Sequence, residues 1–421
     1  MEKYIVEGGR KLSGEIRVAG AKNEALKVIA AAVLSEDVCT IKNVPDIEDI
    51  NRLVEILEDL GASIERSDHQ LIINPAKITK TKPAADLVHK LRSSVMLAGP
   101  LLARFGEVTM AHPGGCIIGQ RPIDIFLAGF KALGAELIEN DQEYTLRAKK
   151  LTGAKIIMPW IAVTATEAIM MTACLAEGET TIINAAMEPE IPALAGYLNS
   201  CGAQISGAGT SIISIKGVNK ISGGTCTLIP DRIEAGSFII MGLASKSEIK
   251  VADLNPAHLE TVIANLQKAG ADLEIGSDYI ITRPSELKGI ELRTHEYPGF
   301  PTDLQAPFTV LMTQAKGLSL IHETIYEGRL FYTDKLNQMG AHIIMCDPHR
   351  VIVNGPAELY GKRLESPDLR AGMALVIAGL IANGKTAVEN IYQIERGYEN
   401  IVSRLQGLGA KIEKIDDCLI N

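Results

Sequence analysis

Residues 112–122 read His-Pro-Gly-Gly-Cys-Ile-Ile-Gly-Gln-Arg-Pro and combine a reactive side chain with unusually permissive backbone. Cys116 follows two glycines, which accept positive φ and let a substrate approach the chain closely. Arg121 stands nearby, and a cation beside a cysteine favours the thiolate, or a thiol that donates its proton. A tight turn around a small, buried cysteine fits the same residues. The loop alone leaves both interpretations open.

Cations also recur at one position of a longer pattern, just before apolar runs that read as helices. Lys22, Arg92 and Arg370 stand there, although none is an N-cap residue type. A cation at the positive end of a helix costs stability unless it meets an anion. Arg329 and Arg396 add cations beside glycines in loops. The pattern suggests convergence on a small polyanion by Lys22, Arg121, Arg329, Arg370 and Arg396. A single arginine more commonly forms a surface salt bridge.

The apolar runs belong to an internal repeat. Each repeat reads as an apolar helix, a β-rich stretch, a second helix, a Gly-Ala pair and a pair of strands. The Gly-Ala pairs recur about every 70 residues and begin at Gly61, Gly134, Gly202, Gly270, Gly340 and Gly409. The expected apolar helices span Glu24–Ser35, Ser94–Arg104, Glu167–Glu177, Ala235–Ser245, Pro307–Lys316 and Ala371–Asn383.

The strand pairs show where the repeats begin and end. Residues 144–158 align with residues 4–18, whereas the sixth repeat stops at Asn421, where its second strand should start. The sequence therefore predicts that the amino-terminal strands complete the sixth repeat, so that the two termini meet on one body.

Six such repeats exceed the size of one hydrophobic core, so we expect two bodies of three repeats each. The first body is predicted to cover 22–229, and the second 1–21 plus 230–421. Two stretches of chain would then cross between the bodies and form a hinge with a cleft that opens and closes. We expect the active site in that cleft. The composition fits an α/β or α+β protein.

Composition also excludes several function classes. The net charge is −9, and aromatic residues make up 4% of the chain, so a nucleic-acid surface is not expected. The amino terminus carries charges where a signal peptide needs an apolar core, and no apolar run reaches the roughly 20 residues that span a bilayer. Seven cysteines without a C-x-x-C pair indicate reduced thiols and a cytoplasmic protein. We expect no membrane partner and a monomer or weak oligomer.

One grouping resembles a metal site. His342, Cys346 and His349 lie close in sequence, but their spacing fits no zinc pattern well. We therefore expect no metal, and no cofactor.

Five motifs together resemble the signatures of the UDP-N-acetylglucosamine enolpyruvyl transferase family, across the whole chain. They are Ala19–Asn23, Pro113–Cys116 with Arg121–Asp124, Phe300–Asp303, Asp368–Ala371 and Arg396–Tyr398. The resemblance implies two inside-out α/β barrels, each of three repeats with buried helices and outer sheets. It also implies transfer of the enolpyruvyl group of phosphoenolpyruvate to the 3′-hydroxyl of UDP-N-acetylglucosamine, with release of phosphate. That reaction commits the sugar nucleotide to peptidoglycan synthesis.

The resemblance further implies roles for individual residues. Cys116 would protonate the C3 methylene of phosphoenolpyruvate, Asp303 would take the proton from the sugar hydroxyl, and Lys22 would act with them at the phosphate. Arginine suits both anionic groups of the substrate, because its fork binds carboxylate and phosphate in a bidentate manner. The expected substrate-binding residues are Asn23, Arg92, Arg121, Pro122, Ile123, Asp124, Ile125, Val163, Ile325, Arg329, Asp368, Arg370 and Arg396.

The expected groups divide by the part of the substrates that they would meet. Lys22, Arg121 and Arg396 would hold the phosphate of phosphoenolpyruvate. Arg329 and Arg370 would hold its carboxylate. The sugar would be read by Asn23, Asp303 and the backbone near Ile325, and the uracil would be flanked by residues 121–125.

Departures from the family pattern keep alternatives open. Phe126 stands where the family usually has His, Ala162 and Thr164 stand where it has Ser and Gly, and Gly328 replaces a usual Asn. They favour, as an alternative, a carboxyvinyltransferase for another nucleotide sugar. A non-catalytic regulator that binds the sugar nucleotide is a further alternative. The shikimate-pathway enolpyruvyl transferase shares the repeat but lacks the Pro-Gly-Gly-Cys loop.

Overall fold

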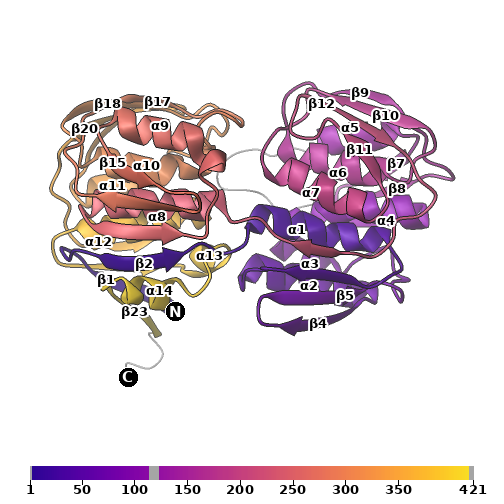
Figure 1. Ribbon diagram of the computed structural model, residues 1–421, viewed down its shortest axis with the longest axis horizontal. Coiled ribbons are helices and arrows are strands. Elements are labelled where there is room, and N and C mark those ends of the chain that lie inside the picture. The colour runs from indigo at the N-terminus through magenta and orange to yellow at the C-terminus, as the bar shows by residue number, and fades with distance from the viewer. Residues whose placement is uncertain (1, 113–122, 417–421) are drawn as a thin grey trace. The chain divides into compact units, whose positions relative to one another are not determined.

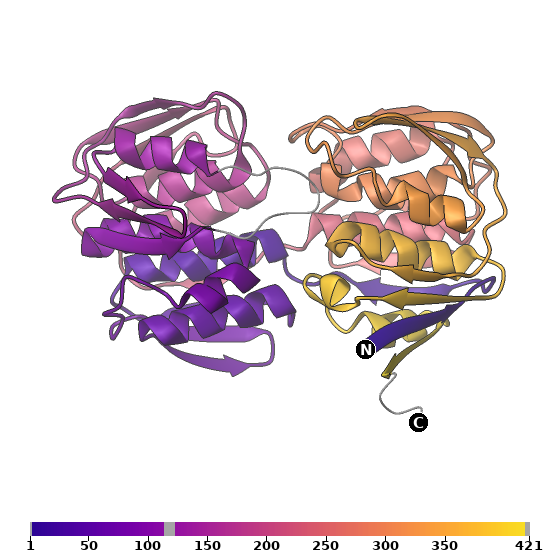
Figure 2. The same ribbon diagram turned by 180° about the vertical axis from the view of Figure 1, so that it is seen from behind.

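The computed structural model describes residues 2–112 and 123–416. They divide into two compact units, each with its own hydrophobic core (Figures 1 and 2). Of the described residues, unit 1 holds 2–19 and 230–416, and unit 2 holds 20–112 and 123–229. The chain changes unit between Ala19 and Gly20, and again between Ile229 and Pro230.

Apolar helices fill the centre of unit 2. They are α1 (Lys22–Ala31), the 3-10 helix η2 (Arg92–Leu97) continued by α4 (Ala98–Phe105), and α6 (Val163–Ala173). A helix that is apolar on every side presents no face to water and must be buried. Accordingly, α4 packs against α6, and η2 packs against both α1 and α6.

Unit 1 has the same plan. Its central helices are α8 (Arg232–Ala244), the 3-10 helix η4 (Thr302–Leu304) continued by α10 (Gln305–Met312), and α12 (Leu369–Ile381). All 13 residues of α8 are buried, and α10 packs against both α8 and α12. Figure 1 shows the three helices stacked in the interior of the unit, with strands outside them. The mixed α/β fold with buried helices and outer sheets is therefore confirmed.

Small sheets enclose the helices of unit 2. The first has the strand order β13-β3-β5-β4, the second β6-β8-β7, and the third β9-β10-β12-β11. The strands are β3 (Cys39–Lys42), β4 (Ser63–Ser67), β5 (Gln70–Asn74), β6 (Glu107–Ala111), β7 (Glu136–Glu139), β8 (Glu143–Arg147), β9 (Lys155–Ile157), β10 (Glu179–Ile183), β11 (Gln204–Ser206), β12 (Ile212–Lys216) and β13 (Thr225–Thr227).

The sheets of unit 1 have the orders β2-β14-β16-β15, β17-β18-β20-β19 and β21-β22-β1-β23. Their strands are β1 (Glu2–Glu7), β2 (Ser13–Arg17), β14 (Glu248–Ala252), β15 (Asp272–Ile275), β16 (Tyr279–Arg283), β17 (Glu291–Arg293), β18 (Gly317–His322), β19 (His342–Asp347), β20 (Arg350–Gly355), β21 (Arg363–Glu365), β22 (Lys385–Glu389) and β23 (Lys411–Asp416).

A second helix in each repeat leads to the Gly-Ala pair. These helices are α2 (Glu48–Leu60), α5 (Asp124–Ala132), α7 (Glu190–Ser200), α9 (Glu260–Lys268), α11 (Thr333–Gln338) and α14 (Ile401–Gly407). The glycine of every pair has positive φ, between 89° and 111°, which glycine adopts without steric cost. The following alanine amide bonds back to the helix, for example Ala62 to the Leu57 carbonyl at 2.9 Å. The Gly-Ala repeat is thus a repeated helix stop. The remaining short helices are η1 (Ala32–Leu34), α3 (Ala85–Lys90), η3 (Pro256–Leu259) and α13 (Tyr392–Glu395).

The amino-terminal strands complete the repeat as predicted. Strand β1 lies between β22 and β23 and pairs antiparallel with both, the place that β8 takes between β6 and β7. Strand β2 passes on to the next sheet and pairs parallel with β14, as β9 does with β10. The alignment of 4–18 with 144–158 is therefore a structural equivalence.

Two local predictions are wrong. The central helices begin earlier than expected, α1 at Lys22 and α6 at Val163, because the first turn of a buried helix tolerates polar residues at its open end. Asp231 and Asp368 cap α8 and α12, and within α6 the hydroxyl of Thr166 donates to the Ala162 carbonyl.

The second repeat also lacks one strand of its sheet. Where the other sheets have a parallel edge strand, the Thr81 carbonyl accepts a bond from the Thr109 amide at 3.0 Å. Pro83 follows, and proline cannot donate to a strand ladder. The chain turns instead into α3.

Carboxylates in the central helices hold the chain where it changes unit. In unit 2, Glu24 accepts a bond from the Ile229 amide at 2.7 Å, and the Ile229 carbonyl accepts one from Ala21 at 2.7 Å. In unit 1, Glu234 accepts from the Ala19 amide at 2.8 Å, and the Ala19 carbonyl accepts from Asp231 at 2.9 Å. Ala19 and Ile229, the last residues before the two crossings, are thus each held through both the backbone amide and the backbone carbonyl.

Candidate active site

Unit 2 presents predicted residues at the starts of its central helices. Lys22, Arg92 and Val163 are the first residues of α1, η2 and α6. Asn23 follows Lys22 and is half-buried. The residues at the N-caps of α1 and α6 are alanines, which have no polar side chain, so first-turn amides of these helices are not capped by them. Such amides suit an anion.

Lys22 is held by a residue that sequence reasoning missed. Its Nζ lies 2.6 Å from Oδ2 of Asp49, in the first turn of α2, and both side chains are less than a tenth exposed. A buried ammonium needs such a partner to remain charged. The only sequence signal for Asp49 is an acid in a first helical turn, which any helix start shows.

In unit 1, three of the predicted residues form two ion pairs that share one carboxylate. Asp303 Oδ1 lies 2.9 Å from Arg329 Nη2, and Oδ2 lies 2.9 Å from Arg370 Nε. The arginine side chains are 6% and 5% exposed, and that of Asp303 is 26% exposed. Burial would raise the pKa of Asp303, but Arg370 and then Arg329 hold it well below its usual range. Asp303 is therefore a firmly ionised carboxylate.

Arg370 is itself positioned by its neighbours. It is the second residue of α12, whose N-cap Asp368 accepts bonds from the amides of Arg370 and Ala371. Its Nη1 lies 3.5 Å from the hydroxyl of Tyr398, which in turn lies 2.9 Å from the hydroxyl of Ser237 on α8. Burial lowers the pKa of Arg370, but Asp303, Tyr398 and Asp231 together outweigh it, so the net shift is upward.

The other predicted residues of unit 1 lie in the loop after β18 and at the end of α13 (Tyr392–Glu395). Ile325 and Arg329 follow β18, and the Arg329 guanidinium lies 5.2 Å from the centre of the Tyr326 ring. Burial lowers the pKa of Arg329, while Asp303, Asp368 and Glu323 together raise it above its ordinary value. Arg396 follows α13, and its Nη1 donates to Gln393 at 3.0 Å.

Cys116, Arg121 and Pro122 lie outside the described residues. Of their neighbours, Ile123 is the half-buried N-cap of α5, and Asp124 is its exposed first residue. Ile125 is 8% exposed and packs in the core of unit 2. Phe126, one of the departures from the family pattern, is 7% exposed and packs in the same core.

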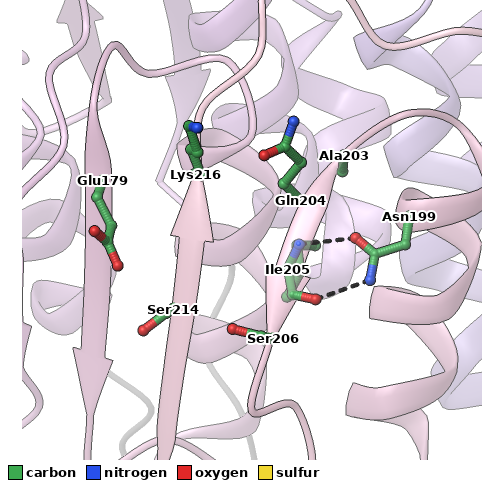
Figure 3. Close-up of a pocket in the computed structure, with 8 residues that line it drawn as sticks. All are labelled: Glu179, Asn199, Ala203, Gln204, Ile205, Ser206, Ser214 and Lys216. Carbon is green, nitrogen blue, oxygen red and sulfur yellow. Dashed lines mark hydrogen bonds between the residues drawn. The ribbon is translucent and has the colours of Figure 1, made fainter.

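An open hollow of about 420 Å³ lies elsewhere on unit 2, beside β11 and β12. Asn199 faces it, but its side chain bonds both to the amide and to the carbonyl of Ile205, at 2.8 and 2.9 Å (Figure 3). These groups pin the edge strand to α7. The hollow contains none of the predicted site residues, and the predicted chemistry does not belong to it.

Two features are absent from the described residues, 2–112 and 123–416. They contain no helix long and apolar enough to cross a membrane. They also contain no cluster of three His, Cys, Asp or Glu side chains arranged to hold a metal ion.

Comparison with known proteins identifies the family. Residues 6–405 match the family model described as EPSP synthase (3-phosphoshikimate 1-carboxyvinyltransferase). UDP-N-acetylglucosamine 1-carboxyvinyltransferase 2 of Carboxydothermus hydrogenoformans is 43% identical over 420 residues, 99% of this chain and 100% of that protein. UDP-N-acetylglucosamine 1-carboxyvinyltransferase of Borrelia garinii is 42% identical over 424 residues, 99% of each chain.

Solved structures show the same fold. The enolpyruvyl transferase NikO from Streptomyces tendae superposes with a TM-score of 0.89 at 24% identity, over 98% of both chains. EPSP synthase from Acinetobacter baumannii superposes with a TM-score of 0.74 at 19% identity, over 99% of this chain and 100% of that one. The chain therefore belongs to the EPSP synthase family of transferases and, within it, to the UDP-N-acetylglucosamine 1-carboxyvinyltransferases.

Proposed function

We propose that the protein transfers the enolpyruvyl group of phosphoenolpyruvate to the 3′-hydroxyl of UDP-N-acetylglucosamine and releases phosphate. The reaction supplies peptidoglycan synthesis. The structural observation that best supports this proposal is Asp303, which is held between Arg329 and Arg370. The chain is also 42% identical to the UDP-N-acetylglucosamine 1-carboxyvinyltransferase of Borrelia garinii.

The arginines suit the carboxylate of phosphoenolpyruvate. Arg329 and Arg370 are buried and oriented, so they lose little freedom when an anion arrives. Lys22, Arg121 and Arg396 are proposed to hold the phosphate, where they also stabilise the charge that develops as it leaves. Asn23 and Ile325 are proposed to contact the sugar, with Arg92, Val163 and residues 122–125 toward the nucleotide.

Proton transfers complete the reaction. Cys116 is proposed to give a proton to C3 of phosphoenolpyruvate while the sugar oxygen bonds to C2 and Asp303 takes the hydroxyl proton. The thiolate left on Cys116 then takes a proton back from C3, the C–O bond to phosphate breaks, and the C2–C3 double bond is restored. Both steps balance without an oxidant, reductant or metal.

Arg370 and Arg329 lower the pKa of Asp303, which makes its carboxylate a weak base before the substrate binds. The incoming carboxylate competes for the same guanidinium groups. As each arginine shares its N–H donors with the substrate carboxylate, the added negative charge raises the pKa of Asp303. The site would thus gain its base when phosphoenolpyruvate binds.

The two groups of residues are proposed to act together, in a cleft between domains 22–229 and 1–21 plus 230–421. The proposed phosphate ligands support this, because Lys22 belongs to unit 2 and Arg396 to unit 1. We also propose a cytoplasmic location, which the free thiols of the described cysteines support, and a monomer or weak oligomer.

Phosphate release tests the reaction. Purified protein with phosphoenolpyruvate and UDP-N-acetylglucosamine should release phosphate only when both are present. Release with another sugar nucleotide alone would favour the different acceptor that Ala162 and Thr164 suggest. Binding of UDP-N-acetylglucosamine without any release would indicate the non-catalytic regulator.

A further inference from the structure

Glu323 lies directly after β18 and is absent from the predicted site. Its side chain is 0% exposed. Its amide donates to the His349 carbonyl at 2.7 Å, and His349 Nδ1 lies 2.7 Å from the Glu323 carbonyl. The neighbouring strand β20 and its turn therefore fix the backbone from which this carboxylate projects.

The carboxylate of Glu323 joins two segments of the candidate site. Its Oε1 accepts bonds from the amides of Ile325 at 2.8 Å and Tyr326 at 3.2 Å. Its Oε2 accepts a bond from the hydroxyl of Thr302 at 2.8 Å. One buried side chain thus ties the start of the loop that carries Arg329 to the residue before Asp303.

The hydroxyl of Thr302 passes this restraint on to Arg329. Nη1 of Arg329 donates to Thr302 Oγ1 at 2.7 Å, while its Nη2 pairs with Asp303. An ionised carboxylate only accepts, so the Thr302 hydrogen points at Glu323 and leaves its lone pairs for Arg329. Charge at both ends strengthens the chain of bonds.

We propose that Glu323 is a positioning residue, which acts through Thr302 and the Ile325 amide to set Arg329, Asp303 and the 325–329 loop for substrate. The inference rests on the proposed function, because it assigns to these groups the binding of phosphoenolpyruvate and the sugar. Glu323 transfers no proton and contacts no substrate in this account.

Substitutions can break the relay at either end. Glu323→Gln keeps the shape, but its NH₂ must face either the Thr302 hydroxyl, which then loses its acceptor, or two backbone N–H groups. Thr302→Val removes the hydroxyl, and Thr302→Ser keeps it. We expect Glu323→Gln and Thr302→Val each to lower kcat/KM for phosphoenolpyruvate about tenfold or more. Thr302→Ser should stay within about threefold of wild type, because the relay is intact.

A double-mutant cycle separates positioning from general damage. Because both substitutions act on one relay, Glu323→Gln with Thr302→Val should be no worse than about threefold below the more damaging single variant. Thr282→Val is the matched control: it removes a hydroxyl that is 0% exposed in the same unit, which donates to the Ser247 carbonyl at 2.9 Å. It should lower the melting temperature and leave KM for both substrates unchanged.

The outcomes are distinct. Wild-type kinetics in Glu323→Gln, additive losses in the double variant, or an equal loss in Thr282→Val would overturn the inference and leave the proposed function standing. A wild-type protein that releases no phosphate would reject the proposed function, and the inference with it. If Glu323→Gln does not fold, the comparison of Thr302→Val with Thr302→Ser decides, because both leave Glu323 in place.

Discussion

Asp303 is a carboxylate whose charge is essential to its surroundings, because Arg329 and Arg370 are buried against it. Its pKa in the fold lies below the unfolded value of about 4. A carboxylate of this kind stabilises the fold above that unfolded value and loses the contribution as the pH falls through the folded pKa.

We therefore expect Asp303→Asn to destabilise unit 1 by about 2 kcal/mol at pH 7, because it leaves two buried guanidinium groups without their shared partner. The difference from wild type should shrink as the pH is lowered below about 4. Urea unfolding at several pH values measures it. Asp347→Asn, which breaks an exposed pair with Arg350, serves as the control and should change stability little. A loss that is the same at every pH would contradict the assignment.

The sequence identified which residue types gather at the site, but not their partners. Lys22, Arg329 and Arg370 stand out because cations at helix starts or beside glycine are unusual. Asp49 and Glu323 do not stand out, because an acid near a helix start or after a strand is ordinary. Their roles depend on contacts between segments far apart in the chain, which no local pattern records.

The Gly-Ala stops are the clearest case in which sequence determines an element. Positive φ leaves a recognisable residue type at a fixed place, six times over. The second repeat's missing strand was not foreseen, because one proline weighs little against a sixfold pattern. Helix starts are misplaced for a related reason: the buried apolar run marks the core of a helix, whereas α1 begins two residues before that run and α6 begins four residues before it.

Two of these glycines allow a comparison within unit 2. A Cβ at Gly61 would lie 2.6 Å from the Lys77 carbonyl oxygen, whereas at Gly202 its closest neighbour would be 4.0 Å away. Their φ values, 111° and 102°, are nearly equal. Both alanine variants should lose about 1 kcal/mol from backbone strain, and Gly61→Ala at least a further 1 kcal/mol from the clash. If denaturant unfolding shows equal losses of unfolding free energy in the two variants, the backbone around Gly61 shifts at little cost to relieve the clash.

At the scale of the whole molecule, the crossings between units are held by buried carboxylates of unequal character. Arg404 lies 2.7 Å from Glu234 and lowers its pKa, although burial is the larger effect and leaves that pKa above its usual value. Burial, together with the charges of Glu190 and Glu167, raises the pKa of Glu24 to about 8, although the Ile229 amide and Lys27 oppose the shift. A carboxyl whose folded pKa is raised favours the fold at low pH, and that contribution is lost as the pH rises through about 8.

Glu24→Gln should therefore match wild type near pH 5 and be more stable near pH 9, by on the order of 2 kcal/mol, since the amide keeps the bond to Ile229 without the buried charge. Thermal unfolding across that range measures the difference. Glu234→Gln should instead be less stable than wild type near neutral pH, because Arg404 loses its charged partner. If the stability of Glu24→Gln depends on pH in the same way as that of wild type, the pH dependence arises from another group.

Residues of both units are proposed to perform one transfer reaction. Mass analysis of the sugar nucleotide, after incubation with phosphoenolpyruvate, tests it most directly. Wild-type protein should convert UDP-N-acetylglucosamine to its enolpyruvyl ether, with one phosphate released for each product formed. Lys22→Ala in unit 2 and Arg370→Ala in unit 1 should each reduce the rate of product formation at least about 100-fold. Full activity in either variant, or phosphate release without the ether, would contradict the claim.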